Sequence, residues 1–254
     1  MSTRLLAASA ALAIALCAGA SAQASVVVFD DFESYVNSPA NGPAYGTSEL
    51  NFAAFDHLTV QSGTVDLIGA DDPWNLMTAY GSAFVDLDGS TGQGGILRTA
   101  QFSFNAGDIV TLEFDLSGNQ RGGADEWSYG LETTGPTQFL NVSVLNSPTL
   151  GLRNLGNLGP GTALASGSES LNYDDPWRHY AISFQAGNAG ALSAFVGTSS
   201  HDNIGPLIDN FSLSIGAAAV PEPGAWAMML MGFAGIGSLL RARRRGPVLA
   251  QARA

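Results

Sequence analysis

The feature that most constrains the fold is a two-residue alternation of apolar and polar side chains in residues 108–117. Because successive side chains of a strand point to opposite faces, this pattern predicts a strand with one covered face and one wet face. Such strands are typical of antiparallel sheets. Residues 179–185 repeat the pattern. The apolar positions of the two stretches are Val110, Leu112, Phe114 and Leu116, and Tyr180, Ile182 and Phe184.

Short stretches with strand character recur along residues 25–220, and no long stretch there has helical periodicity. Turn-forming sequences separate them, as at 105–108 (Asn-Ala-Gly-Asp) and 188–190 (Asn-Ala-Gly). About nine short strands in one domain predict an all-β fold, a two-sheet antiparallel β-sandwich of the jelly-roll type. Residues 150–170 are rich in Gly, Asn and Ser and are predicted to form a long loop. The further expected strands are Phe102–Phe104, Val26–Phe29, Thr64–Ile68, Phe84–Asp88, Asn141–Leu145, Leu192–Val196 and Leu207–Ile215.

The first 24 residues have the three parts of a secretory signal peptide. Arg4 provides positive charge, residues 5–20 are uncharged, and 22–24 (Ala-Gln-Ala) form a small-x-small cleavage site. We therefore expect a signal-peptide helix that is cleaved after Ala24, with an uncleaved anchor helix as the alternative. The single cysteine, Cys17, lies in this segment, so the mature chain has no thiol for catalysis or metal binding.

The C-terminus combines a Pro-Glu-Pro motif at 221–223, an apolar stretch at 225–240 and an arginine cluster at 241–245. At about 1.5 Å per residue, a helix over the apolar stretch spans roughly 24 Å, against a bilayer core of roughly 30 Å. Trp226 and the arginines extend it at its two ends by aromatic anchoring and snorkelling, and the arginines favour a cytoplasmic C-terminal end. The stretch therefore predicts a hydrophobic transmembrane helix.

This three-part C-terminus resembles the PEP-CTERM sorting signal of Gram-negative bacteria. The resemblance implies an exosortase-type processing enzyme as a partner and export to the cell envelope, the outer surface or the medium. The C-terminal helix would anchor the protein in the inner membrane only transiently, and a permanent single-span anchor is the alternative. We expect a signal peptide (1–24), a β-sandwich domain (25–216) and a sorting signal (217–254). The sorting-motif residues are Pro221, Glu222, Pro223, Arg243, Arg244 and Arg245.

Between its two ends the chain is strongly acidic. Residues 25–220 contain four arginines, no lysine and 21 of the 22 acidic residues, which gives a net charge of −17. Such a surface repels nucleic acid and anionic lipid, so nucleic acid is not an expected partner. The charge is compatible with cations, with neutral sugars, or simply with solubility outside the cell.

Three short segments of the body resemble galactose-binding-type jelly rolls, which are found among carbohydrate-binding modules. They are 29–33 (Phe-Asp-Asp-Phe-Glu), 85–90 (Val-Asp-Leu-Asp-Gly-Ser) with the glycine-rich stretch that follows, and 205–211 (Gly-Pro-Leu-Ile-Asp-Asn-Phe). In such modules an acidic residue in the first strand and an aspartate in the last strand meet at a structural calcium ion. The resemblance thus implies that Glu33 and Asp209 are ligands of a structural Ca²⁺.

The pattern of the last strand also singles out Asp209. It shares its parity with Phe211, Leu213 and Ile215, so it faces the core if these apolar residues do. A carboxylate there is costly unless it is paired or bound to a cation. The alternative is that Asp209 caps a turn or accepts backbone hydrogen bonds at the sheet edge.

The sequence Asp-Asp-Pro-Trp occurs twice, at 71–74 and 174–177. Carboxylates beside an indole suit sugar binding, because the ring stacks on the apolar face of a pyranose and the acids accept its hydroxyls. We therefore consider Trp74, with Asp71 and Asp72, as ligand-binding residues. The alternative is local structure, in which Asp before Pro starts a turn and Trp anchors the next strand. For Trp177 this alternative is favoured.

Residues 125–127 (Asp-Glu-Trp) are a third acidic and aromatic spot, so Trp127 is also a candidate ligand residue. Catalysis finds little support, because the three histidines are scattered and no nucleophile elbow, zinc motif or phosphate loop is present. The Asp-x-Asp-Gly at 86–89 lacks the remaining acidic positions of an EF-hand loop.

We therefore expect a non-enzymatic, exported protein that associates with the envelope or with exopolysaccharide and binds glycan. A secreted polysaccharide hydrolase is one alternative, which would need two suitably spaced carboxylates among the many acids. A structural or adhesive surface protein is the other.

Overall fold

The computed structural model describes residues 24–36, 47–69, 72–146, 150–154, 162–166, 169–218, 230–237 and 241. These residues form fifteen strands in two antiparallel sheets, so the predicted all-β sandwich is confirmed. The signal peptide up to residue 23 and the sorting-motif residues at 221–223 and 243–245 lie outside the described residues. The strands are β1 (Ser25–Asp30), β2 (Leu58–Ser62), β3 (Asp66–Gly69), β4 (Ala83–Asp86), β5 (Ile96–Thr99), β6 (Phe102–Phe104), β7 (Asp108–Ser117), β8 (Ala124–Thr133), β9 (Phe139–Leu145), β10 (Leu150–Asn154), β11 (Thr162–Ser166), β12 (Glu169–Asn172), β13 (Arg178–Ala186), β14 (Gly190–Thr198) and β15 (Leu207–Ala217).

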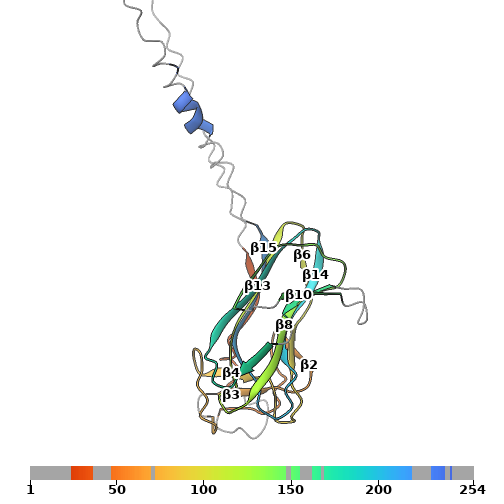
Figure 1. The fold of residues 1–254 in the computed structure, drawn as a ribbon, viewed down its shortest axis with the longest axis vertical. Coiled ribbons are helices and arrows are strands. Elements are labelled where there is room, and N and C mark those ends of the chain that lie inside the picture. The colour runs from red at the N-terminus through yellow and green to blue at the C-terminus, as the bar shows by residue number, and fades with distance from the viewer. Residues whose placement is uncertain are drawn as a thin grey trace, which may run out of the picture. The chain divides into compact units, whose positions relative to one another are not determined.

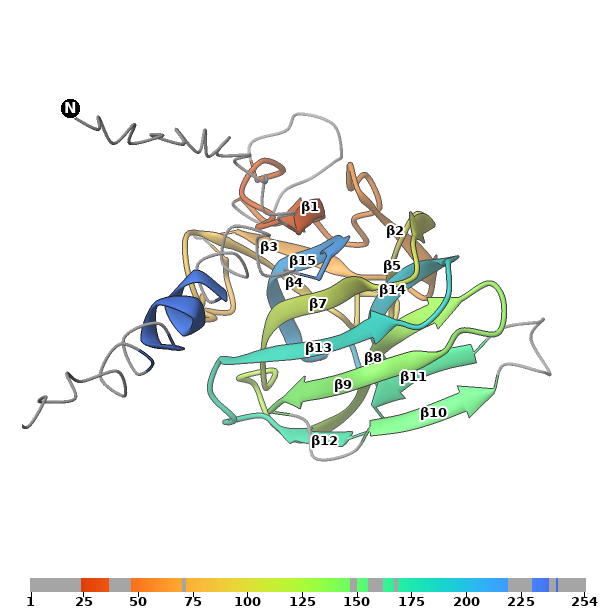
Figure 2. The same ribbon diagram turned by 90° about the horizontal axis from the view of Figure 1, so that it is seen from above.

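The two sheets pack face to face (Figure 1, Figure 2). The first sheet has the order β3-β4-β15-β7-β13-β9, and β1 also pairs with β15. The second has the order β10-β11-β8-β14-β5-β2, with β12 paired to β8 and β6 paired to β14. The predicted turns at 105–108 and 188–190 are short connections that carry the chain from one sheet to the other, between β6 and β7 and between β13 and β14.

The core lies between the sheets and is built from alternating positions of each strand. The four apolar residues of β7 at positions 110–116 are fully buried, as their alternation predicts. Phe114 of β7 stacks on Tyr180 of β13, with ring centroids 5.8 Å apart. It also meets Tyr129 of β8 edge-on, at 5.1 Å. This aromatic cluster therefore joins the centres of the two sheets.

The long loop predicted over 150–170 is wrong, because this stretch contains the strands β10, β11 and β12. β11 and β12 pair with β8, and β10 pairs with β11. The glycine- and asparagine-rich composition gives these residues little intrinsic strand preference. Pairing with β8 supplies the backbone hydrogen bonds that local preference does not predict.

A β-bulge in β15 changes the face that Asp209 occupies. The register against β7 shifts just after Asp209, which pairs with Asp115, and Asn210 in the bulge has a φ of 51°. The extra residue lets Ile208 and Phe211 both face the core, although they differ in parity. The expectation that Asp209 faces the core together with Phe211 is therefore wrong. Asp209 is buried on the outer face of the first sheet, where it is 1% exposed.

A second, smaller apolar cluster, the outer cluster, covers part of this face. Each strand residue in it alternates with a core residue, so it lies on the opposite side of the first sheet from the core. Leu76, the one buried member outside the strands, belongs to the β3–β4 connection, which therefore folds back over the sheet. The buried members are Ile68, Leu76, Phe84 and Leu207, and Trp74 and Trp177 pack against them.

The sandwich unit comprises residues 23–218, and the C-terminal segment belongs to a separate unit. In that segment residues 230–237 and 241 are helical. Among the described residues, no helix combines the length and the apolar character needed to cross a membrane. The expected transmembrane helix of 225–240 is thus described only over part of its length.

Candidate functional site

The two Asp-Asp-Pro-Trp motifs, about a hundred residues apart in the sequence, meet at the outer cluster. The ring of Trp177 contacts Phe84 edge-on, with centroids 5.9 Å apart. Its Nε1 donates a hydrogen bond to the backbone oxygen of Met77, at 2.8 Å. Trp74 packs against the same cluster three residues before Met77. One motif is therefore tied directly to the chain that follows the other.

In each motif an aspartate shapes the turn that carries the tryptophan. The carboxylate of Asp72 accepts hydrogen bonds from the backbone N–H of Trp74, at 2.8 Å, and of Leu76, at 3.2 Å. The carboxylate of Asp175 accepts one from the N–H of Asn172, at 2.8 Å. These two aspartates hold backbone rather than stand free, as the local-structure alternative predicts.

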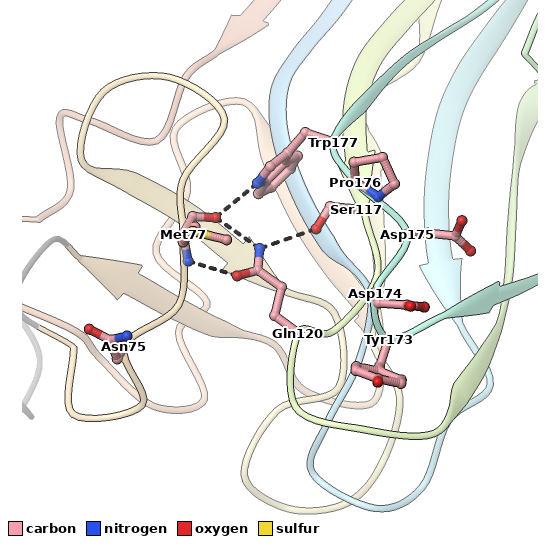
Figure 3. Close-up of a pocket in the computed structure, with 9 residues that line it drawn as sticks. All are labelled: Asn75, Met77, Ser117, Gln120, Tyr173, Asp174, Asp175, Pro176 and Trp177. Carbon is pink, nitrogen blue, oxygen red and sulfur yellow. Dashed lines mark hydrogen bonds between the residues drawn. The ribbon is translucent and has the colours of Figure 1, made fainter.

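The β7–β8 loop completes the site through Gln120. Its side-chain oxygen accepts a hydrogen bond from the N–H of Met77, at 2.8 Å, and its side-chain nitrogen donates to the Met77 oxygen, at 2.9 Å (Figure 3). The backbone N–H of Gln120 also donates to the oxygen of Tyr173, at 2.9 Å. One glutamine thus connects the β3–β4 connection with the β12–β13 connection.

These three connections enclose a hollow of about 450 Å³, here called the Tyr173 hollow. Figure 3 shows Asn75 on one side of it and Tyr173 with Asp174 on the other. Tyr173 is 46% exposed, and Asn75 and Asp174 are exposed as well. An aromatic ring, an amide and a carboxylate therefore remain available to a ligand, whereas Gln120 and Trp177 are held in place. The lining residues are Asn75, Met77, Ser117, Gln120, Tyr173, Asp174, Asp175, Pro176 and Trp177.

The structure separates the sequence-predicted ligand residues. Trp74 lines a neighbouring hollow, and Asp72 holds its turn. Asp71 lies outside the described residues. The expectation for Trp127 is wrong, because this side chain is only 2% exposed and stacks on Tyr129 in the core, at 5.2 Å. Its ring faces are not available to a sugar.

Two residues of the Tyr173 hollow that the sequence analysis did not single out are neighbours of the motifs. Asn75 directly follows the first motif, and Tyr173 directly precedes the second. Their position beside the repeated motif, in sequence rich in turn-forming residues, is the feature that could have indicated them. Gln120 had no such signal, because only the folded β7–β8 loop brings it to the site.

The expected calcium ligands, Glu33 and Asp209, lie near enough for the charge of Glu33 to act on Asp209. Both carboxylate oxygens of Glu33 accept hydrogen bonds, from the N–H of Ser82, at 2.6 Å, from the Ser82 hydroxyl, at 2.6 Å, and from the N–H of Ala83, at 2.9 Å. Although burial acts to raise it, these hydrogen bonds lower the pKa of Glu33. Glu33 is thus held as an anion.

Asp209 is less well satisfied than Glu33. One of its oxygens accepts a hydrogen bond from the N–H of Asn210, at 2.7 Å, and the backbone of Tyr80 also acts to lower its pKa, but Oδ2 has no hydrogen bond of good geometry among the described residues. Burial, together with the charges of Asp115 and Glu33, raises the pKa of Asp209 to about 7. An unpaired, buried carboxylate oxygen near a second carboxylate fits a calcium ion. Since the described residues hold no group of three or more His, Cys, Asp or Glu side chains suited to a metal, the other ligands would be carbonyl groups or water.

Comparison with known proteins identifies the C-terminal segment. No curated protein matches the chain. Among solved structures, the CBM22-1 xylan-binding domain from Paenibacillus barcinonensis Xyn10C is similar, with a TM-score of 0.42, 12% identity and coverage of 68% of this chain and 94% of that one. Residues 219–245 match the family model of the PEP-CTERM protein-sorting motif, as the sequence predicted. The chain thus carries a PEP-CTERM protein-sorting motif at its C-terminus, which indicates an exported protein.

Proposed function

We propose that this exported protein binds polysaccharide through the Tyr173 hollow. The observation that carries the proposal is the composition of that hollow, which presents an exposed tyrosine beside an exposed amide and an exposed carboxylate. A pyranose offers an apolar face to such a ring and hydroxyls to both polar groups. Preformed hollows with an apolar wall and few fixed polar groups are typical of small-ligand sites.

The proposed function is binding without hydrolysis. Glycoside hydrolysis uses a pair of carboxyl groups that act on the substrate as acid and base or nucleophile. The Tyr173 hollow has two carboxylates, and that of Asp175 is engaged by the N–H of Asn172 and by Arg178, at 3.5 Å. Of these two carboxylates, only that of Asp174 has no hydrogen bond within the described residues.

Affinity electrophoresis of the purified protein in gels containing xylan, β-glucan, galactan or chitosan tests this function. We expect retardation by at least one polysaccharide, and we expect Tyr173→Ala and Asp174→Asn each to weaken it about tenfold or more, because each removes a direct contact. Phe29→Ala is the matched control, since Phe29 is also an exposed aromatic, at 53%, but does not line the hollow. Equal retardation of all variants, or release of reducing ends from the bound polysaccharide, would contradict the proposal.

We further propose that both ends of the chain are removed on export. The sorting motif would hold the protein transiently in the inner membrane until an exosortase-type enzyme cleaves near 221–223, and the product would associate with envelope or extracellular polysaccharide. Intact-mass spectrometry of the exported protein should find a chain that begins at Ser25 and lacks the apolar stretch 225–240. An exported chain that retains the arginines at 241–245 would refute the proposed processing.

We also propose that Glu33 and Asp209 hold a structural Ca²⁺. Two neighbouring carboxylates, one of them with an unpaired buried oxygen, support this assignment. A bound cation would compensate the negative charge that Asp209 carries in a buried position. Thermal unfolding in CaCl₂ and in EDTA measures the effect, and equal midpoints in the two buffers would rule the ion out.

A further inference from the structure

A second hollow, of about 410 Å³ and here called the Trp74 hollow, adjoins the first. The two share a wall formed by the β3–β4 connection and the β7–β8 loop. Trp74 and Arg121 line the Trp74 hollow. Their neighbours in the sequence, Asn75 and Gln120, line the Tyr173 hollow. Because consecutive Cα atoms are only about 3.8 Å apart, this wall is one residue thick at two places.

The β7–β8 loop in this wall is held in shape by Asn119, whose side chain is buried. Its Oδ1 accepts hydrogen bonds from the N–H of Arg121, at 2.7 Å, and of Gly122, at 2.9 Å. Its Nδ2 donates to Asp125, at 2.9 Å. Gln120 in this turn has a φ of 60°. The loop is therefore fixed by internal bonds, and it presents two polar side chains to opposite hollows.

At the Trp74 hollow, Arg121 lies against a buried carboxylate. Its guanidinium contacts Asp86, whose other oxygen accepts hydrogen bonds from the N–H of Asp88, at 3.0 Å, and of Gly205, at 2.9 Å. The side chain of Asp86 is 2% exposed, whereas that of Arg121 is 20% exposed. Asp86 thus pairs with Arg121, whose side chain is partly exposed and lines the hollow.

This arrangement selects the chemistry of a ligand. Arg121 offers N–H donors, and the carboxylates of Asp66 and Asp202 line the same hollow. Asp66 is buried and both of its oxygens accept hydrogen bonds from Asn51 and Ser90, so the exposed Asp202 is the acid that a ligand can reach. Two acids in addition to the balanced pair disfavour an anion. A hydroxyl group both donates and accepts, so a sugar can bond to the guanidinium and to Asp202, beside the half-buried Trp74 that lines the hollow.

We propose that the Trp74 hollow is a second sugar subsite and that the protein binds a neutral glycan chain lying across the shared wall. This inference rests on the proposed function, because the Tyr173 hollow supplies the first subsite. It adds a requirement for length, since a short oligosaccharide fills one hollow and a longer one reaches both. Specificity then comes from Arg121 as well as from Tyr173.

Isothermal titration with xylo-, cello-, manno- and chito-oligosaccharides of two to six sugars tests the second subsite. For the wild type, affinity should rise with length in the series that binds. Arg121→Lys keeps a charge beside Asp86 but loses the planar fork of donors. It should weaken binding of the longest oligosaccharide about tenfold and leave the shortest unchanged.

Arg98→Lys is the matched control, since Arg98 also pairs with an acid, Glu132, and its side chain is 22% exposed, but it lies on β5 and lines neither hollow. If Arg121→Lys fails to fold, Asn203→Gly provides the test. Asn203 lines the Trp74 hollow, is exposed and has a φ of 64°, which glycine adopts without strain. We expect it to weaken only the longer oligosaccharides.

The two levels of the proposal fail differently. If the wild type binds no oligosaccharide and no polysaccharide, the glycan-binding function itself is refuted. If it binds and Tyr173→Ala abolishes binding, but both Trp74-hollow variants bind long oligosaccharides as the wild type does, only the second subsite is overturned. An affinity that does not depend on length would overturn it as well.

Discussion

Replacing Trp127 by alanine is expected to lower the free energy of unfolding by about 3–5 kcal/mol. Trp127 is 2% exposed and its ring contacts three aromatic rings from both sheets. It stacks on Tyr129 and meets Tyr180 and Phe114 edge-on, with centroid distances of 4.9 and 6.1 Å. Truncation would remove these contacts and leave a cavity between strands that cannot close on it, because β7 and β8 lie near the centres of their sheets.

Urea unfolding followed by fluorescence and far-UV circular dichroism measures this loss. Tyr173→Ala is the control, since it also removes an aromatic ring, but an exposed one, and is expected to change stability by less than about 0.5 kcal/mol. The comparison also separates the two roles considered for Trp127. If Trp127→Ala left stability unchanged and abolished polysaccharide binding, the ring would belong to a ligand site and not to the core.

The sandwich was predictable wherever one face of a strand is wet and the other is covered. In β7 the alternation predicts all four buried apolar residues at positions 110–116, because each inward position meets the second sheet. The same reasoning applies to β8, where Trp127 shares its parity with Tyr129 and Leu131. That parity, rather than the acidic neighbours of Trp127, carried the information about its burial.

The bulge in β15 could not be predicted from this pattern. Phe211, Leu213 and Ile215 face the core as expected, and one extra residue before them reverses every position that precedes it. The same strand sequence paired without a bulge would have put Asp209 in the core. Its burial was therefore expected correctly but for the wrong reason, since the β3–β4 connection and not the second sheet lies over that face.

The site itself depends on contacts between distant segments. The repeated motif signalled that Trp74 and Trp177 belong to turns, but nothing in the spacing shows that both turns pack on one apolar cluster. That cluster exists because Ile68, Phe84 and Leu207 come together on neighbouring strands. Each hollow is then a consequence of covering a sheet face with loops, which leaves gaps lined by the ends of several connections.

The stability of the calcium-free protein is expected to fall as the pH rises from about 4 to about 7. The pKa of Asp209 is raised to about 7 in the folded protein, above the usual aspartate value of 3.8 that the unfolded chain should show. Between these values the folded state keeps a proton that the unfolded state has lost, so raising the pH favours unfolding. Below 3.8 the contribution of Asp209 is fully present, and above about 7 it has been lost. The total is on the order of 2–4 kcal/mol.

Urea unfolding in EDTA at pH 5 and pH 8, for the wild type and for Asp209→Asn, isolates this contribution from those of the other acids. Asparagine is neutral at both pH values, so the variant should gain stability relative to the wild type at pH 8 but not at pH 5. Asp174→Asn, at an exposed position, is the control and should follow the wild type. Calcium added at pH 8 should restore the stability of the wild type alone, because it binds the anion that is costly to bury. Parallel pH profiles for wild type and Asp209→Asn would mean that Asp209 is already compensated by its surroundings, and they would remove the physical reason for a cation at this position.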